Sequence, residues 1–260
     1  MLETPLGWGL LFVVGIVTGT LSGLLGIGGG LLMVPVLTFF EIPLVQATAT
    51  SLIGVFLSAV SGSIRNFLAK ELNWRVSLLL AAFGILTAQV GAWLGDRLPD
   101  AGLSLAFAAL LLLTIYLMGL RQQLKQQRDQ PEMKLMVSQA NFLAIVGIGL
   151  SAGLLSGLFG VGGGIVMVPL QMLFLREPVK SAVRTSLGAI VPIATSGLVQ
   201  HAVNDNVLWI PGLCLGLGGI LGAQMGSRLL PTLPDRAVNQ LFRFFLVAFA
   251  IYMVIRAFNQ

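Results

Sequence analysis

The chain alternates long apolar runs with short polar segments. The runs predict helices over residues 6–26, 30–40, 45–64, 75–94 and 103–120, and over residues 141–160, 164–175, 181–200, 208–228 and 237–256. Most of them can cross roughly 30 Å of hydrocarbon, but the short runs 30–40 and 164–175 cannot span a membrane unaided. Composition agrees, because only 10% of the residues are charged, against about 25% in soluble domains. The pattern predicts an all-α polytopic protein embedded in a lipid bilayer.

A glycine motif occurs twice, each time just before a short run. Ser22-Gly-Leu-Leu-Gly-Ile-Gly-Gly-Gly-Leu-Leu-Met-Val-Pro35 returns as Ser156-Gly-Leu-Phe-Gly-Val-Gly-Gly-Gly-Ile-Val-Met-Val-Pro169. Apolar segments that glycine and proline interrupt at corresponding places in two halves are typical of a transporter's binding site. We therefore expect function where the two copies meet.

The repeat extends well beyond the glycines, at an offset near 135 residues. It defines a first repeat over 1–120, a polar linker over 121–138 and a second repeat over 139–260. Matching positions include Ala47 with Ala182, Thr50 with Thr185, Ser51 with Ser186, Asn66 with His201, Trp74 with Trp209, and Gln89 with Gln224.

The distribution of charged residues predicts how the two halves are oriented in the membrane relative to each other. If the chain turns back at the glycines, nearly all loop cations gather on one side, and only Arg97 and Arg256 remain on the other. Lys and Arg accumulate in cytoplasmic loops, so this model places the linker inside and both termini outside. The cationic loop 65–75 also corresponds to the cation-free loop 200–208. We therefore predict two inverted-topology repeats, each with a glycine-broken, re-entrant first segment and three further helices.

Consecutive glycines inside a bilayer expose backbone amides, which hydrocarbon tolerates only beside protein or a watery cavity. A helix that resumes after such a break directs N–H groups and a positive dipole end at that cavity, which favours an anion. The alternative is that the glycines only allow close helix packing. A nucleotide loop is excluded, because Leu31 and Ile165 follow the glycines where such a loop needs Lys and Ser or Thr.

Neutral donors in the spans complete the predicted site, since hydroxyls and amides can bind an oxyanion without a buried cation. Helix–helix hydrogen bonding is the alternative role for them. The predicted substrate-binding residues are Gly28, Gly29, Gly30, Thr50, Ser51, Gln89, Gly162, Gly163, Gly164, Thr185, Ser186 and Gln224.

Other chemistries find little support in the sequence. All ten carboxylates fall in or beside loops, so none is placed for a mid-span proton relay. His201 stands alone, which favours packing over proton transfer and excludes a metal cluster with a second His or Cys. We expect no cofactor and no enzymatic activity. We also expect no nucleic-acid partner, because the cations lie in loops. The oligomeric state is left open.

The motifs resemble the TauE/SafE family of sulfite and organosulfonate exporters, from Gly15 to Arg256. The resemblance rests on the two glycine motifs with Pro35 and Pro169, and on the segments Ala47-Thr-Ala-Thr-Ser51 and Ala182-x-x-Thr185-Ser186. The resemblance implies a carrier for sulfite, sulfoacetate or related anions in a bacterial plasma membrane. A passive anion channel and an importer of thiosulfate-like or sulfate-like anions are the alternatives. Val183-Arg184 replaces Thr48-Ala49, so the two half-sites need not contribute equally.

Overall fold

The computed structural model describes residues 4–126, 139–229 and 235–259, and these residues form helices and no strand. Among the described residues, six helices are long and apolar enough to cross a membrane, namely α1 (Pro5–Leu25), α3 (Leu44–Leu68), α4 (Trp74–Gly95), α6 (Gln139–Phe159), α8 (Val179–Val203) and α9 (Trp209–Leu229). The described helices are α1 (Pro5–Leu25), α2 (Gly30–Phe39), α3 (Leu44–Leu68), α4 (Trp74–Gly95), α5 (Asp100–Gln126), α6 (Gln139–Phe159), α7 (Gly164–Phe174), α8 (Val179–Val203), α9 (Trp209–Leu229) and α10 (Asp235–Asn259).

The ends of these helices follow local chemistry. Pro5 occupies the first turn of α1, and the Thr4 hydroxyl accepts a 3.3 Å hydrogen bond from the Gly7 N–H, which satisfies one free donor of that turn. Helix α5 continues to Gln126, six residues past the predicted end at 120. The first part of the predicted linker 121–138 is therefore helical, and residues 127–138 lie outside the described residues.

The backbone repeats between the halves at four left-handed residues. Glu41 and Arg176 follow α2 and α7 with φ of 62° and 56°, and Lys70 and Asp205 follow α3 and α8 with φ of 56° and 55°. Both pairs are separated by the 135-residue offset of the sequence repeat. Equivalent helices of the two halves thus end in the same backbone geometry.

Helices of one half pack mainly against helices of the other. Helix α1 lies along α9, α4 lies along α6, and α3 contacts both α8 and α9. Glycines make this possible: a Cβ atom on Gly15 would lie 2.2 Å from the Leu215 carbonyl oxygen, and one on Gly157 would lie 1.9 Å from that of Ala88. Small residues let backbones approach in membranes, and here they join the two repeats into one core.

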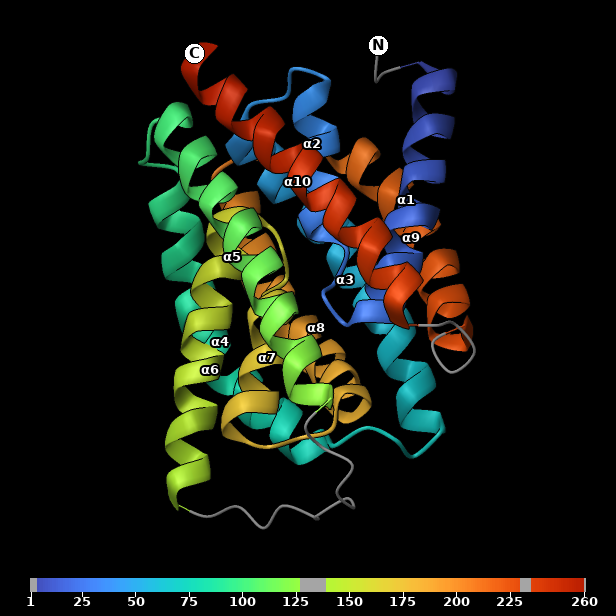
Figure 1. The fold of residues 1–260 in the computed structure, drawn as a ribbon. Coiled ribbons are helices and arrows are strands. Elements are labelled where there is room, and N and C mark those ends of the chain that lie inside the picture. Colours follow the sequence, from blue (N-terminus) through green and yellow to red (C-terminus); the bar gives the residue numbers. More distant parts are fainter. Residues whose placement is uncertain (1–3, 127–138, 230–234, 260) are drawn as a thin grey trace.

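The start of α1 and the end of α10 lie at one end of the molecule, and the end of α5 and the start of α6 lie at the opposite end (Figure 1). Helix α1 runs away from the N-terminal end, and α2 returns toward it. Helices α6 and α7 show the same reversal from the other end (Figure 1). Near the end of α2, Arg256 and Tyr252 of α10 donate hydrogen bonds of 2.8 and 3.0 Å to the Thr38 carbonyl. Such donors satisfy carbonyls left open at a helix C-terminus.

Candidate functional site

Both glycine motifs form the same tight backbone turn. Three glycines of each turn have φ between 66° and 82°, namely Gly26, Gly28 and Gly29 in the first and Gly160, Gly162 and Gly163 in the second. Only glycine adopts this region without steric cost. The turns connect α1 to α2 and α6 to α7, so their conformation sets the direction of both short helices.

The two turns lie directly against each other in the fold. A Cβ atom on Gly30 would lie 2.0 Å from the Gly160 carbonyl oxygen, and one on Gly164 would lie 2.3 Å from that of Gly26. A Cβ atom on Gly162 would come within 3.9 Å of the Gly28 Cα. Two segments separated by more than one hundred residues thus form one backbone-lined centre, buried among α3 and α8.

The first N–H groups of α2 and α7 are available at this centre. The first bonds of α2 run from Leu32 and Met33 to the Gly29 carbonyl, and those of α7 run from Val166 and Met167 to the Gly163 carbonyl. Earlier N–H groups have no acceptor within the helix, and neither N-cap makes a side-chain hydrogen bond. Two positive helix ends therefore meet where the turns touch, which is an arrangement that attracts an anion.

Unpartnered hydroxyls accompany the turns. Ser22 and Ser156 are fully buried, and their hydroxyl oxygens have no hydrogen-bond partner. Ser22 lies on the last turn of α1, with its Cβ 3.4 Å from the position that a Cβ on Gly29 would take. Thr48 and Thr185 are also fully buried with unpartnered hydroxyls. Such groups are costly to leave unpaired, and a bound anion would give those beside the turns an acceptor.

Three of the four predicted hydroxyls are already used by the protein. The Thr50 hydroxyl accepts a 3.1 Å bond from the Leu208 N–H at the start of α9. Ser51 donates to the carbonyls of Thr48 and Gly160 at 2.7 and 3.0 Å. The Ser186 hydroxyl accepts a 2.7 Å bond from the Gln171 amide. Ser51 therefore supports the second turn directly, and among these four only Thr185 keeps a free hydroxyl.

The predicted amides lie away from the turns. Gln89 is exposed on the surface of α4. Gln224 is half-buried in α9, and its amide donates to the carbonyl and the hydroxyl of Ser61, each at 3.1 Å. The structure thus brings together the six predicted glycines with Ser51, and it separates both glutamines from them.

Two apolar side chains cover the junction. Val55 of α3 and Ile190 of α8 are fully buried and occupy matching positions of the repeat. A Cβ on Gly28 would lie 3.1 Å from Val55 and 3.5 Å from Ile190, and one on Gly162 would lie 2.6 and 3.2 Å from them. The turns are therefore covered by a matched pair of apolar side chains.

Four residues at the turns were not predicted from the sequence, namely Ser22, Ser156, Val55 and Ile190. All four recur at the repeat offset, and this is the signal by which they could have been found. Val183 packs against Gly26 of the first turn, and the next residue in the sequence is the cation Arg184. Its guanidinium forms a 2.9 Å ion pair with Glu71. The donors at the turns are thus backbone amides and hydroxyls.

Comparison with known proteins identifies the family. The model of the family "Sulfite exporter TauE/SafE" matches residues 11–253, which includes both glycine turns and every helix that contacts them. The chain belongs to the TauE/SafE family. It is accordingly a multi-pass membrane transporter.

Relatives of this TauE/SafE protein match along most of their length. The probable membrane transporter protein YunE of Bacillus subtilis is 25% identical, over 94% of this chain and 96% of its own. A probable membrane transporter protein of Methanocaldococcus jannaschii is 31% identical, over 74% and 71%. One of Xylella fastidiosa is 29% identical, over 92% of both chains. No solved structure gives a significant match.

Proposed function

We propose that this TauE/SafE transporter binds a small sulfur-containing oxyanion, such as sulfite or sulfoacetate, between its two glycine turns. The observation that carries the proposal is the meeting of two helix N-termini beside the unpartnered hydroxyls of Ser22 and Ser156. A sulfonate head has several acceptor oxygens for such donors. Neutral donors bind an anion without a buried counter-charge, and release it readily.

We further propose that the halves are inverted repeats that alternate access to this centre. Support comes from the opposite courses of the α1–α2 and α6–α7 segments (Figure 1). It also comes from packing, since α1 against α9 and α6 against α4 are equivalent pairs of the repeat. In this proposal both termini face outward from the bacterial plasma membrane, and the linker 121–138 is cytoplasmic. Val55 and Ile190 close the centre in the state described here.

The binding site is tested by removing the two serine hydroxyls. Ser22→Ala and Ser156→Ala should each weaken sulfoacetate binding by about 10-fold, because one hydrogen bond to a charged group is worth roughly 1.5–3 kcal/mol. Ser104→Ala on α5 is the matched control, since Ser104 is equally buried and also unpartnered. The measurement is calorimetric binding to purified protein. Equal affinity in all three variants and wild type would remove the serines from the site.

Transport is tested in reconstituted vesicles. A screen with sulfite, sulfoacetate, taurine, thiosulfate and sulfate defines the preferred anion. A carrier should show saturable uptake and counterflow of labelled anion against its own gradient, whereas a channel shows neither counterflow nor saturation at low concentration. Absence of flux for every anion of the panel would contradict the proposal.

A further inference from the structure

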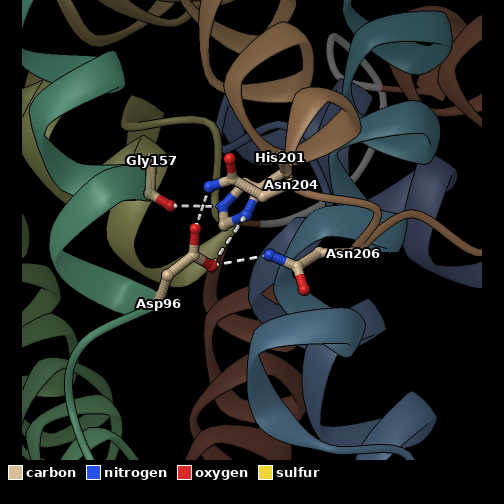
Figure 2. A network of polar contacts seen from close by, with 5 residues as sticks. All are labelled: Asp96, Gly157, His201, Asn204 and Asn206. Atoms are coloured by element: carbon tan, nitrogen blue, oxygen red, sulfur yellow. Dashed lines mark hydrogen bonds and ion pairs between the residues drawn. The ribbon is translucent and has the colours of Figure 1, made fainter.

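His201 lies at the end of α8 beside the second glycine motif, and its side chain is fully buried. Its Nε2 atom is 3.0 Å from the Gly157 carbonyl oxygen. A carbonyl only accepts hydrogen bonds, so Nε2 carries the hydrogen, and the neutral ring then has a bare lone pair on Nδ1. Nδ1 has no hydrogen-bond partner. Figure 2 shows this nitrogen facing the carboxylate of Asp96.

The carboxylate opposite is held in place from the α8–α9 loop. Asn206 donates its amide to Asp96 Oδ1 at 2.6 Å, and Asn204 donates to Oδ2 (Figure 2). Both carboxylate oxygens therefore act as hydrogen-bond acceptors here. The Nδ1 lone pair lies 3.9 Å from Oδ1, so two acceptors face each other with no proton between them. One added proton on Nδ1 converts this contact into a charge-assisted hydrogen bond.

We propose that His201 and Asp96 form a proton-binding site that couples proton movement to anion transport. This coupling rests on the proposed transport function, whereas the proton site itself does not. The proton binds to Nδ1 of the imidazole and leaves from the same atom. The resulting imidazolium is stabilised by the Asp96 carboxylate across the interface between α4 and α8.

Among the charged groups near the His201 ring, Asp96 is the one placed to stabilise the imidazolium. The Arg97 guanidinium stacks 3.7 Å above the Trp93 ring of its own segment. Asp205 is exposed in the loop after α8. From α6 the ring meets the Gly157 carbonyl, and α3 contributes the apolar Ala49 and Ile53 to the cluster beside Ala202. The charged groups to consider are thus Asp96, Arg97 and Asp205.

The site is linked mechanically to the anion centre. Gly157 directly follows Ser156 and lies three residues before Gly160, so the imidazole holds the last turn of α6 where it enters the second glycine turn. Asp96 belongs to the first repeat and His201 to the second. Proton binding therefore changes a contact between repeats and next to the turn. A positive imidazolium there also favours an anion bound at the turn.

The first repeat has no equivalent of the His201 proton site. His201 corresponds to Asn66, and both residues accept a 3.0 Å backbone bond from the residue five positions later, Asn206 and Glu71 respectively. The backbone geometry is the same, but an asparagine cannot titrate. The repeat position therefore provides one proton site, at His201, and we expect one proton to bind there in each anion cycle.

The proton site is tested by NMR without any transport assay. His201 is the only histidine of the chain, so ¹⁵N-histidine labelling of untagged protein reports this ring alone. The neutral ring should show the Nε2–H tautomer and should bind one proton reversibly as the pH is lowered. Asp96→Asn should move the midpoint to lower pH, whereas Asp205→Asn should leave it in place. A ring that never binds a proton while the protein stays folded, or that shows the Nδ1–H tautomer, would overturn the site.

Coupling is tested in vesicles that contain the pH dye pyranine, with sulfoacetate as the anion because it stays fully ionised from pH 6 to 8. Wild-type protein should move protons together with sulfoacetate. His201→Gln keeps an amide donor for the Gly157 carbonyl but cannot titrate, so it should retain sulfoacetate counterflow and lose proton movement. Equal proton movement in both proteins would refute the coupling. If wild type shows no counterflow, the proposed transport function fails, and the NMR titration still decides the proton site.

Discussion

Gly30 faces Gly160 so closely that a Cβ atom on Gly30 would lie 2.0 Å from the Gly160 carbonyl oxygen. The obstacle is backbone, which cannot rotate away as a side chain can. The equivalent pair, Gly164 and Gly26, has the same relation at 2.3 Å. The requirement for glycine at these positions therefore comes from contact between the two repeats, in addition to the left-handed residues of each turn.

Gly30→Ala and Gly164→Ala should both destabilise the protein. The added methyl group must push the two turns apart, which costs about 1–3 kcal/mol in a packed core. Gly9→Ala on α1 is the control, because a Cβ there meets nothing within 4 Å, and alanine is favoured over glycine in a helix by roughly 0.5–1 kcal/mol. Thermal unfolding in detergent should rank Gly9→Ala at or above wild type and the other two below it. A Gly30→Ala midpoint equal to that of Gly9→Ala would contradict the close contact.

The hydrophobic pattern and the repeat were enough to predict most of the fold. The short helices expected over 30–40 and 164–175 are found as Gly30–Phe39 and Gly164–Phe174. The end of α5 was predicted too early because the first charged residues mark where a helix leaves the apolar layer, while its backbone bonds can continue to Gln126. At a membrane surface, the first polar residues therefore mark where a helix leaves the apolar layer and not where the helix ends.

The candidate site was less predictable, because a hydroxyl's role depends on partners that are distant in sequence. Thr50 binds Leu208, 158 residues away, and Ser51 binds Gly160, 109 residues away. No local pattern distinguishes these used hydroxyls from the free one of Thr185. Glycines with a left-handed backbone, such as Gly28 and Gly162, were predictable because that conformation is dictated locally, whereas Gly30 and Gly164 are required by contact with the other repeat.

Thr50→Val and Thr185→Val should therefore have different effects. Valine at position 50 leaves the Leu208 N–H without its acceptor, which costs roughly 1–3 kcal/mol of stability. Valine at position 185 removes a hydroxyl that has no partner, so the stability should stay level or rise, while sulfoacetate affinity falls by about 10-fold if Thr185 donates to the anion. Thermal unfolding and calorimetric binding on both variants separate these effects. Equal loss of stability in the two would refute the assignment.

Shortening Val55 or Ile190 should change which anions fit. Each covers both glycine turns, so Val55→Ala and Ile190→Ala enlarge the centre and should favour sulfoacetate over sulfite in competition binding. Ile→Ala in a core costs about 2–5 kcal/mol, and Ile193→Ala controls for that loss, because Ile193 is equally buried on α8 but contacts Gly84. A selectivity change in Ile193→Ala as large as that in Ile190→Ala would point to general loosening.

Glu177 makes stability depend on pH. Burial in the α7–α8 loop raises the pKa of this carboxyl from 4.5 to about 7, against a smaller lowering by the Ser181 hydroxyl. The folded protein therefore holds this proton more tightly than the unfolded chain, and stability falls as the pH rises from about 4.5 to about 7. Glu177→Gln should remove the penalty, raising stability by up to about 3 kcal/mol at pH 8 and much less at pH 5. Thermal unfolding of both proteins at the two pH values measures it; an equal gain at both would contradict the raised pKa.

The four left-handed loop residues provide a matched test of topology. Glu41, Lys70, Arg176 and Asp205 are all exposed and share nearly the same backbone conformation, so cysteines placed there differ mainly in the side of the membrane they occupy. In the inverted arrangement Glu41→Cys and Asp205→Cys face outward, and Lys70→Cys and Arg176→Cys face the cytoplasm, as the excess of cations inside requires. With Cys214, the only native cysteine, replaced by alanine, an impermeant thiol reagent added to intact cells should label the first pair, and the second pair only after permeabilisation. If the chain instead ran straight through the glycines, each half would cross the membrane four times, so positions 41 and 176 would share one side and positions 70 and 205 the other. Labelling of Glu41→Cys together with Arg176→Cys, or of Lys70→Cys together with Asp205→Cys, in intact cells would therefore refute the reversal at the glycine turns.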